Sequence, residues 1–263
     1  MYDSSLLNRA KTMVEAVFSL LGERDSLVLS SFPRDVEKII TFALEIPIRK
    51  EPELTLSSAR RYLCAIGGDS STLGNIPNDR KLHGLLHIGS PCTIIFVCAS
   101  LPLHIQAYIL AHELGHILAD VFLKQHLWLK SLPEREDAIR RYFNWEDLDP
   151  WLELTAFLRG LPLRPQPIVG RGENFAPETT EREIIADLFA RELLAPWDRV
   201  ARSCNSTSKR DFAAILRSQY NLPLKIAASY YDEIKRHFLP NSSLYDRLLT
   251  QLVVQPKKDS TEC

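Results

Sequence analysis

The sequence lacks any C-x-x-C pair, and its five cysteines, an odd number, are scattered along the chain. This pattern differs from a disulfide framework and favours a reducing compartment. No stretch is long and apolar enough to span a bilayer. The N-terminal segment, MYDSSLLNRAKTMVEAVFSLLGERD, carries charges inside its apolar pattern, which a signal peptide does not. We therefore expect a cytoplasmic protein without a membrane partner.

The chain also lacks an excess of charge of either sign. It has 32 lysines and arginines and 33 aspartates and glutamates, which gives a formal net charge of -1. A chain this close to neutral is not expected to bind nucleic acid directly. With 263 residues, 45% of them hydrophobic, it is long enough for one substantial core, or for a core domain with a helical appendage.

The first hundred residues predict helices followed by a short sheet. Apolar residues recur at spacings of three and four over 4–21 and 33–44, which indicates two amphipathic helices. Residues 67–80 are rich in Gly, Ser, Asn and Pro, which is typical of a loop. The short apolar segments KLHGLLHI (81–88) and TIIFVCAS (93–100) then predict two antiparallel strands.

A further helix follows directly from the second strand. Ser100 is its expected N-cap and Pro102 lies in its first turn, and the apolar pattern continues to about Phe122. After a region that is harder to interpret, helical periodicity returns with Thr179 or Thr180 as the expected cap, and it stops at Pro196.

The C-terminal part predicts three more helices. Residues 209–238 read as a helix, a short turn at 221–223 and a second helix, and 242–254 predict a last one. The polar tail, 256–263, is expected to be disordered.

The segment ILAHELGHILAD, residues 109–120, places His112 and His116 four apart, with Glu113 directly after the first histidine. Positions four apart share one face of a helix, so both imidazoles can bind one ion while the glutamate lies beside it. Zinc peptidases use this H-E-x-x-H arrangement: the ion brings the pKa of a bound water down to about 7, and the glutamate takes up the proton. The spacing alone leaves open an amphipathic helix that carries histidines by chance.

A third ligand would decide between these alternatives. The metzincin extension is absent, because Ala119 and Phe122 occupy the places of its glycine and third histidine. A gluzincin-like centre instead takes a glutamate from a second helix, and Glu183 and Asp187 lie four apart on the predicted helix 179–196. We expect Glu183 as the ligand and Asp187 as the acceptor for the outer N–H of a metal-bound histidine. A solvated acidic face is the alternative, but carboxylates on a helix that is apolar on most sides need a partner.

Other candidates carry weaker signals. Asp120, one turn beyond the motif, is an alternative ligand that fits the end of the helix better. His83 and His87 lie on one face of a predicted strand, where packing and surface roles are common, although an exposed strand edge can also hold an extended peptide. Tyr108, one turn before the motif, either packs in the core or supplies an oxyanion donor.

Together these segments resemble the ImmA/IrrE family of metallopeptidases, whose hallmark is A-H-E-L-G-H followed by E-x-x-A-[DN]-x-F-A-x-x-L-L-x-P. Residues 111–116 match the first motif at every position. The second motif is matched by Glu183, Ala186, Asp187, Phe189, Ala190, Leu193, Leu194 and Pro196. The likeness covers 80–120 and 179–196, with a looser likeness at 211–238 to the helix-turn-helix-like stretch that often follows the core.

The resemblance implies an α+β, mostly helical fold: a zincin-like core in which a short antiparallel β-sheet packs on the H-E-x-x-H helix, plus additional helices. The implied domains are a peptidase domain over 1–200 and a helical, helix-turn-helix-like region over 201–255. The connection between the two motifs is longer than is usual in the family, so a helical insertion is expected at 123–178.

By the same resemblance His112, His116 and Glu183 are the metal ligands and Glu113 is the catalytic base. The expected ion is zinc, although two histidines and a glutamate also serve manganese. Family members typically cleave a helix-turn-helix transcriptional repressor and so relieve repression of a mobile element, a prophage or a stress response. We therefore expect a zinc-dependent endopeptidase that acts on one such protein partner.

The alternative is a non-catalytic regulatory binding module, in which a structural metal stabilises the fold and the protein binds a repressor or DNA. The intact Glu113 argues against it, because a structural site has no use for a base and usually closes its fourth position with another Cys or His.

Overall fold

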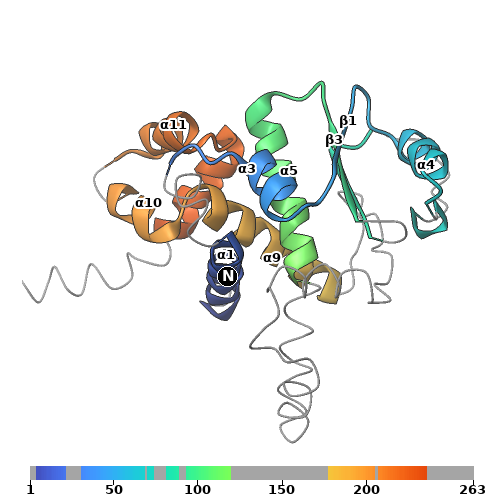
Figure 1. The fold of residues 1–263 in the computed structure, drawn as a ribbon. Coiled ribbons are helices and arrows are strands. Elements are labelled where there is room, and N and C mark those ends of the chain that lie inside the picture. Colours follow the sequence, from blue (N-terminus) through green and yellow to red (C-terminus); the bar gives the residue numbers. More distant parts are fainter. Residues whose placement is uncertain are drawn as a thin grey trace, which may run out of the picture.

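The computed structural model describes residues 4–21, 31–68, 70–73, 81–88, 93–119, 177–204 and 207–235. These residues form a mostly helical molecule with one small three-stranded sheet, which confirms the α+β class (Figure 1). None of the helices in these ranges has the length and apolar character needed to cross a membrane.

The sheet differs from the prediction in its third strand. β2 (Gly84–His87) and β3 (Ile94–Cys98) pair antiparallel as predicted. β1 (Ile48–Glu51) lies on the other side of β3 and runs parallel to it. The prediction of an antiparallel sheet is therefore wrong in this respect, and the sheet is mixed. β1 gives no strand signal because Arg49 and Lys50, at its centre, are both exposed and break any alternation.

The side chains of β3 alternate between two hydrophobic clusters. Ile94 and Phe96 point to the smaller cluster, which the sheet shares with α4 (Leu56–Ala65). Ile95 and Val97 point to the main cluster, which contains the apolar residues of the other helices. β3 is thus buried on both faces, with α4 outside the sheet and the helical body inside (Figure 1).

The helix α4 was not predicted, although its start carries a local signal. The Thr55 hydroxyl accepts a hydrogen bond from the Ser58 N–H at 3.1 Å, and the Ser58 hydroxyl accepts one from the Thr55 N–H at 3.0 Å. This reciprocal capping box satisfies two backbone donors at the first turn. The buried residues that follow, Leu56, Ala59 and Leu63, have helical spacing.

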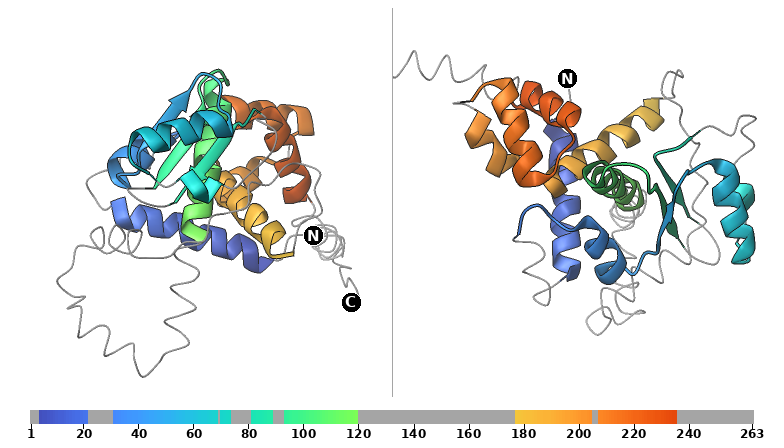
Figure 2. Two further views of the ribbon diagram at one scale, coloured as in Figure 1. Left: turned by 90° about the vertical axis from the view of Figure 1, so that its right-hand side faces the viewer. Right: turned by 90° about the horizontal axis from the view of Figure 1, so that it is seen from above.

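Two helices cross at the centre of the molecule. α5 (Leu103–Leu118) packs against β2 and β3 and is crossed on its other side by α9 (Pro177–Leu194). α9 also packs on α1 (Ser4–Leu21), the helix predicted for the N-terminus. Seen from above in Figure 2, α5 is viewed end-on between the sheet and α1. This central position buries α9 on most sides, as its apolar sequence predicted.

A glycine permits the close approach of α5 and α9. A Cβ atom added at Gly115 would lie 2.9 Å from Ala186 Cα and 3.1 Å from Phe189 Cδ1. Both distances are shorter than an ordinary contact, and one is to backbone, which cannot swing aside. The glycine inside HELGH therefore sets the distance between the helix with the two histidines and the helix with Glu183.

The start of α5 differs from the prediction. Pro102, not Ser100, is the N-cap, and it makes no side-chain capping bond. The Ser100 hydroxyl instead lies 3.2 Å from Cys98 Sγ. The turn before the helix is held by the Gln106 amide, which donates to the carbonyls of Ala99 and Leu101.

The start of α9 also differs from the prediction. The helix begins at Pro177, so Thr179 and Thr180 lie in its first turn and neither is the cap. Proline suits this place because its missing N–H would have no intrahelical partner there. The predicted stop is confirmed, since α9 ends at Leu194, and α10 (Trp197–Cys204), which was not predicted, follows.

The helix predicted over 33–44 is shorter and irregular. α3 (Val36–Lys38) is capped by the Asp35 side chain and continues into η2 (Ile39–Ala43), a π-helical turn. Loop 67–80 is described only in part, and it contains a short 3-10 turn, η3 (Ser70–Leu73).

The predicted helix, turn and helix in the C-terminal part are confirmed. α11 (Lys209–Tyr220) ends at Asn221, whose left-handed conformation (φ 59) starts the turn, and residues 224–235 are helical. Their buried side chains, Phe212, Leu216, Leu222, Tyr230 and Ile234, belong to the same cluster as those of α5 and α9. The boundary expected near residue 200 stays a prediction.

Several predictions lie outside the described residues. They are the end of the motif helix near Phe122, the helical insertion 123–178 apart from 177 and 178 in α9, the last helix over 242–254 and the tail 256–263.

Candidate metal centre

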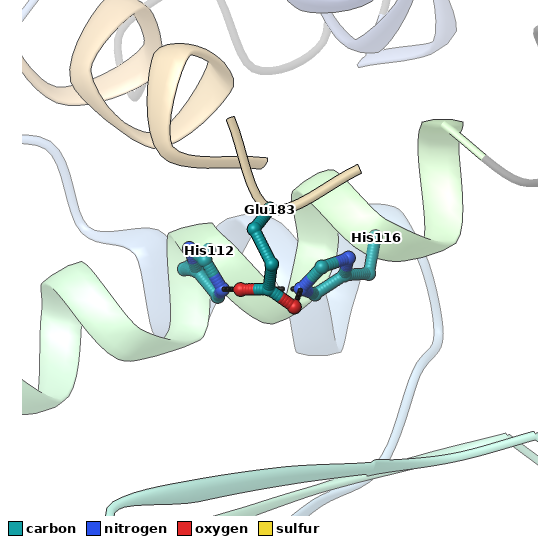
Figure 3. A group of neighbouring side chains, drawn as sticks. All are labelled: His112, His116 and Glu183. Carbon is teal, nitrogen blue, oxygen red and sulfur yellow. Dashed lines mark hydrogen bonds and ion pairs between the residues drawn. The ribbon is translucent and has the colours of Figure 1, made fainter. Parts of the chain in front are cut away.

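The three predicted ligands come together where α5 and α9 cross. His112 Nε2 and His116 Nε2 lie 3.0 Å apart. One Glu183 carboxylate oxygen lies 3.4 Å from the first nitrogen, and the other lies 3.5 Å from the second. Figure 3 shows the carboxylate lying across the gap between the two imidazoles. α9 approaches α5 closely at Gly115. Glu183 can therefore reach both histidines, although it follows them by 67 or more positions in the sequence.

The donor atoms fit a small divalent ion. Bonds of about 2.0–2.1 Å to a tetrahedral zinc place neighbouring ligand atoms roughly 3.3 Å apart. The two histidine nitrogens, 3.0 Å apart, are close to that spacing, and each faces a different Glu183 oxygen, at 3.4 and 3.5 Å. Two histidines and a carboxylate also form a donor set that suits zinc. His112, His116 and Glu183 are thus a group that could hold a metal ion.

Asp187 orients the first histidine. Its Oδ1 lies 2.9 Å from His112 Nδ1 and accepts a hydrogen bond of 2.9 Å from the Tyr108 hydroxyl. With the Nδ1 side engaged, Nε2 is the atom that faces Glu183 and His116. This is the relation predicted for Asp187, and such outer partners of metal-binding histidines fix both the ring orientation and the tautomer.

The electrostatics of His112 and Asp187 follow from that bond. Burial lowers the pKa of His112, but the hydrogen bonds with Asp187 and Glu183 outweigh it and raise the pKa to about 10. Burial raises the pKa of Asp187, but the hydrogen bond and charge of His112 hold it below its usual value. Both shifts favour a positively charged imidazole beside a negatively charged carboxylate.

Glu113 lies between the histidine helix and the sheet. A Cβ atom added at Gly84, the first residue of β2, would lie 2.8 Å from Glu113 Oε1 and 2.4 Å from Ile109 Cγ2. Burial raises the pKa of Glu113 to about 7, and the charge of Glu183 adds to this while His112 opposes it. A carboxylate with such a pKa can both accept and donate a proton near neutral pH.

The weaker candidates lie elsewhere or have other partners. His83 is exposed just before β2 and His87 is buried within it, and neither belongs to the group formed by His112, His116 and Glu183. Asp120 lies outside the described residues. The buried Tyr108 hydroxyl is bonded to Asp187, which supports a positioning role more than the proposed oxyanion donor.

Two contacts of the site were not predicted. The contact between Gly84 and Glu113 gives no local sequence signal, because it joins a strand and a helix. Arg191 Nη2 lies 3.9 Å from Asp187 Oδ2, and the spacing of four on one helix could have indicated it.

Comparison of the chain with protein-family models, with curated proteins and with solved structures finds no match. The case for a function accordingly rests on the residues of this site and on the two motifs.

Proposed function

We propose that the protein is a zinc-dependent endopeptidase with a zincin-like core, which cleaves a specific protein partner in the cytoplasm. By the motif resemblance, the partner is a helix-turn-helix transcriptional repressor, and cleavage relieves repression. The observation that supports this most is the convergence of His112, His116 and Glu183 within 4.8 Å, with Glu113 beside them.

The ligand set favours a catalytic site over a structural one. His112, His116 and Glu183 would hold the ion and leave one position open, as in hydrolytic zinc sites. When bound, zinc supplies Lewis-acid chemistry that makes water acidic near pH 7 and polarises a carbonyl. Within the described residues, no cysteine or further histidine joins this group to close the fourth position.

Glu113 is the proposed general base. Its carboxylate takes the proton of the attacking water and returns it to the leaving amine, and a pKa near 7 suits both steps. Asp187 keeps the His112 ring in place, and Tyr108 holds Asp187 through the same oxygen. These two residues act through His112 and do not need to touch the substrate.

The position of β2 supports an extended peptide as the substrate. The strand order β1-β3-β2 places β2 at one edge of the sheet. An extended peptide can add to such an edge through main-chain hydrogen bonds. Because Gly84 lies against the Glu113 carboxylate, a peptide aligned on this strand passes close to the proposed base.

The test is a comparison of protein N-termini in cells that express either the wild type or Glu113→Gln. The variant keeps all three ligands, so it should bind metal and fold like the wild type while cleavage is lost. We expect new N-termini in the wild type alone, mapping to one or a few proteins that include a helix-turn-helix repressor. Identical N-termini in both cells, with zinc bound in both proteins, would refute a peptidase and support the binding module.

A further inference from the structure

A line of charged groups leads from the candidate metal centre to the C-terminal helix 224–235. His112 contacts Asp187 at 2.9 Å, and Asp187 Oδ2 lies 3.9 Å from Arg191 Nη2. Arg191 Nη1 donates in turn to Glu233 on the helix 224–235. The signs alternate along the line, and the Arg191 and Glu233 side chains are each only 5% exposed.

We propose that Glu233 is a positioning residue of the metal centre, acting through Arg191 and Asp187 on His112. The inference rests on the proposed function in one respect: it requires that His112 binds the metal. The C-terminal helices then belong to the centre as well, because the helix 224–235 supplies Glu233, the last residue of the line.

Arg191 carries a buried positive charge. A guanidinium this deeply buried requires anionic neighbours, because a buried charge that loses its partner strongly destabilises the fold. Among the described residues, two carboxylates lie near the Arg191 guanidinium. Glu233 accepts a hydrogen bond from it, and Asp187 Oδ2 lies 3.9 Å from its Nη2. Glu233 therefore offsets charge on the guanidinium, while Asp187 Oδ1 accepts the bond from His112.

Loss of the Glu233 charge should lower the affinity of the centre for zinc. Without it, Arg191 draws closer to Asp187, whose Oδ1 already accepts bonds from Tyr108 and His112. Asp187 then becomes a weaker acceptor for His112, which makes the imidazole a weaker ligand. The positive charge that Glu233 no longer offsets also repels a divalent cation. Both effects lower the affinity for zinc.

The packing around Arg191 fixes Glu233 in place. The Tyr230 ring, one turn before Glu233, lies 5.9 Å from the Arg191 guanidinium, and its hydroxyl donates to the Ala195 carbonyl at 3.1 Å. The Trp197 ring packs on Tyr230 with centroids 5.6 Å apart. The helix 224–235 is thus held against the end of α9, and this packing keeps the Glu233 carboxylate next to Arg191.

The test measures zinc affinity by competition with a chromophoric chelator, for wild type, Glu233→Gln and a matched control. The control is Glu192→Gln, which also neutralises a buried carboxylate next to Arg191 in sequence, but one that accepts from the Trp197 N–H. We expect a loss of roughly 3- to 10-fold in Glu233→Gln, below the 10–100-fold typical of a direct partner of a metal-bound histidine. Glu192→Gln should stay within about twofold of the wild type. Equal affinities of wild type and Glu233→Gln, or an equal loss in both variants, would overturn the proposal.

The double variant Arg191→Met with Glu233→Gln separates positioning from general damage. It removes both charges, and replacing a whole buried ion pair is often neutral for stability. With no guanidinium to compete for Asp187, it should recover at least half of the lost affinity on a logarithmic scale. A double variant weaker than Glu233→Gln alone would overturn the proposal.

Cobalt(II) absorption gives a second readout of the ligand geometry. The visible band of Glu233→Gln should shift from that of the wild type, whereas the band of Glu192→Gln should coincide with it. If Glu233→Gln fails to fold, Glu233→Asp decides the matter. Its shorter side chain withdraws the carboxylate from Arg191, so we expect a loss of roughly two- to threefold, and an unchanged affinity would overturn the proposal. Absence of zinc from the wild type would refute the proposed function as well, whereas zinc binding unaffected in Glu233→Gln would refute this inference alone.

Discussion

His112 and Asp187 are joined across the crossing of α5 and α9, with 2.9 Å between Nδ1 and Oδ1. This contact decides which imidazole nitrogen faces Glu183 and His116. It also links the two motifs of the sequence, since one residue comes from HELGH and the other from the acidic motif of α9.

Replacing Asp187 with Asn should weaken zinc binding by about 10–100-fold, because a neutral amide holds the His112 ring less firmly and leaves it less basic. Chelator competition measures the affinity. Tyr108→Phe is the control, since it removes the other donor on the same oxygen and leaves the bond to His112 intact. It should cost about 1 kcal/mol of stability and clearly less affinity than Asp187→Asn. Wild-type affinity in Asp187→Asn would contradict the orienting role.

Zinc binding should release at least about one proton at pH 7. The pKa of His112 is raised to about 10, so its ring is protonated in the metal-free protein at neutral pH. The proton and the ion compete, and the competition weakens as the pH rises, so the affinity should increase about tenfold per pH unit for each proton released. Calorimetry in buffers of different ionisation enthalpy counts the protons. No release at pH 7 would show that His112 is neutral before the ion binds.

Gly115→Ala should destabilise the fold by about 1–3 kcal/mol, because the new methyl group meets Ala186 Cα at 2.9 Å. The sign of the change is diagnostic, since alanine in a helix is otherwise favoured over glycine by about 1 kcal/mol. Denaturant unfolding measures the difference. A more stable variant would mean that the crossing has room for a Cβ atom.

The sequence was most informative where function requires residues at a fixed local spacing. His112 and His116 share a helix face, as do Glu183 and Asp187, so the spacing of each pair indicated that its two side chains lie side by side. The contact of the two pairs was inferred from chemistry, and the helix crossing brings them together. The motifs therefore predicted which side chains lie together better than the periodicity predicted the ends of the helices, where the caps at Ser100 and at Thr179 or Thr180 were wrong.

Contacts between distant segments could not be predicted in this way. β1 pairs in parallel with β3, more than 40 residues later, and its four residues include two exposed charges. The contact of Gly84 with Glu113 and that of Arg191 with Glu233 likewise depend on how whole elements pack. Neither contact has a local pattern that could indicate it.

Gly84→Ala should displace Glu113 while leaving the metal ligands in place. The new Cβ atom meets Glu113 Oε1 at 2.8 Å and Ile109 Cγ2 at 2.4 Å, and His112, His116 and Glu183 are not among its three nearest neighbours. We expect a loss of stability of about 1–3 kcal/mol, an unchanged zinc content and slower cleavage of the partner.

The control for this change is Gly67→Ala. Gly67 has a φ of +73, and among the described residues beyond its chain neighbours no atom lies within 4 Å of the added Cβ, so alanine there costs mainly backbone strain, about 1–2 kcal/mol. Its cleavage rate should equal that of the wild type. Equal cleavage by Gly84→Ala and the wild type would contradict the claim that the contact with Gly84 positions Glu113 for cleavage.

The central claim is that His112, His116 and Glu183 hold one metal ion. It is tested most directly by the ratio of metal to protein in the wild type and in Glu183→Ala, measured by elemental analysis after dialysis against metal-free buffer. The account predicts about one zinc per chain in the wild type and its loss in the variant. A wild type that holds no metal even after zinc is added back would contradict it, and so would a variant that retains the ion.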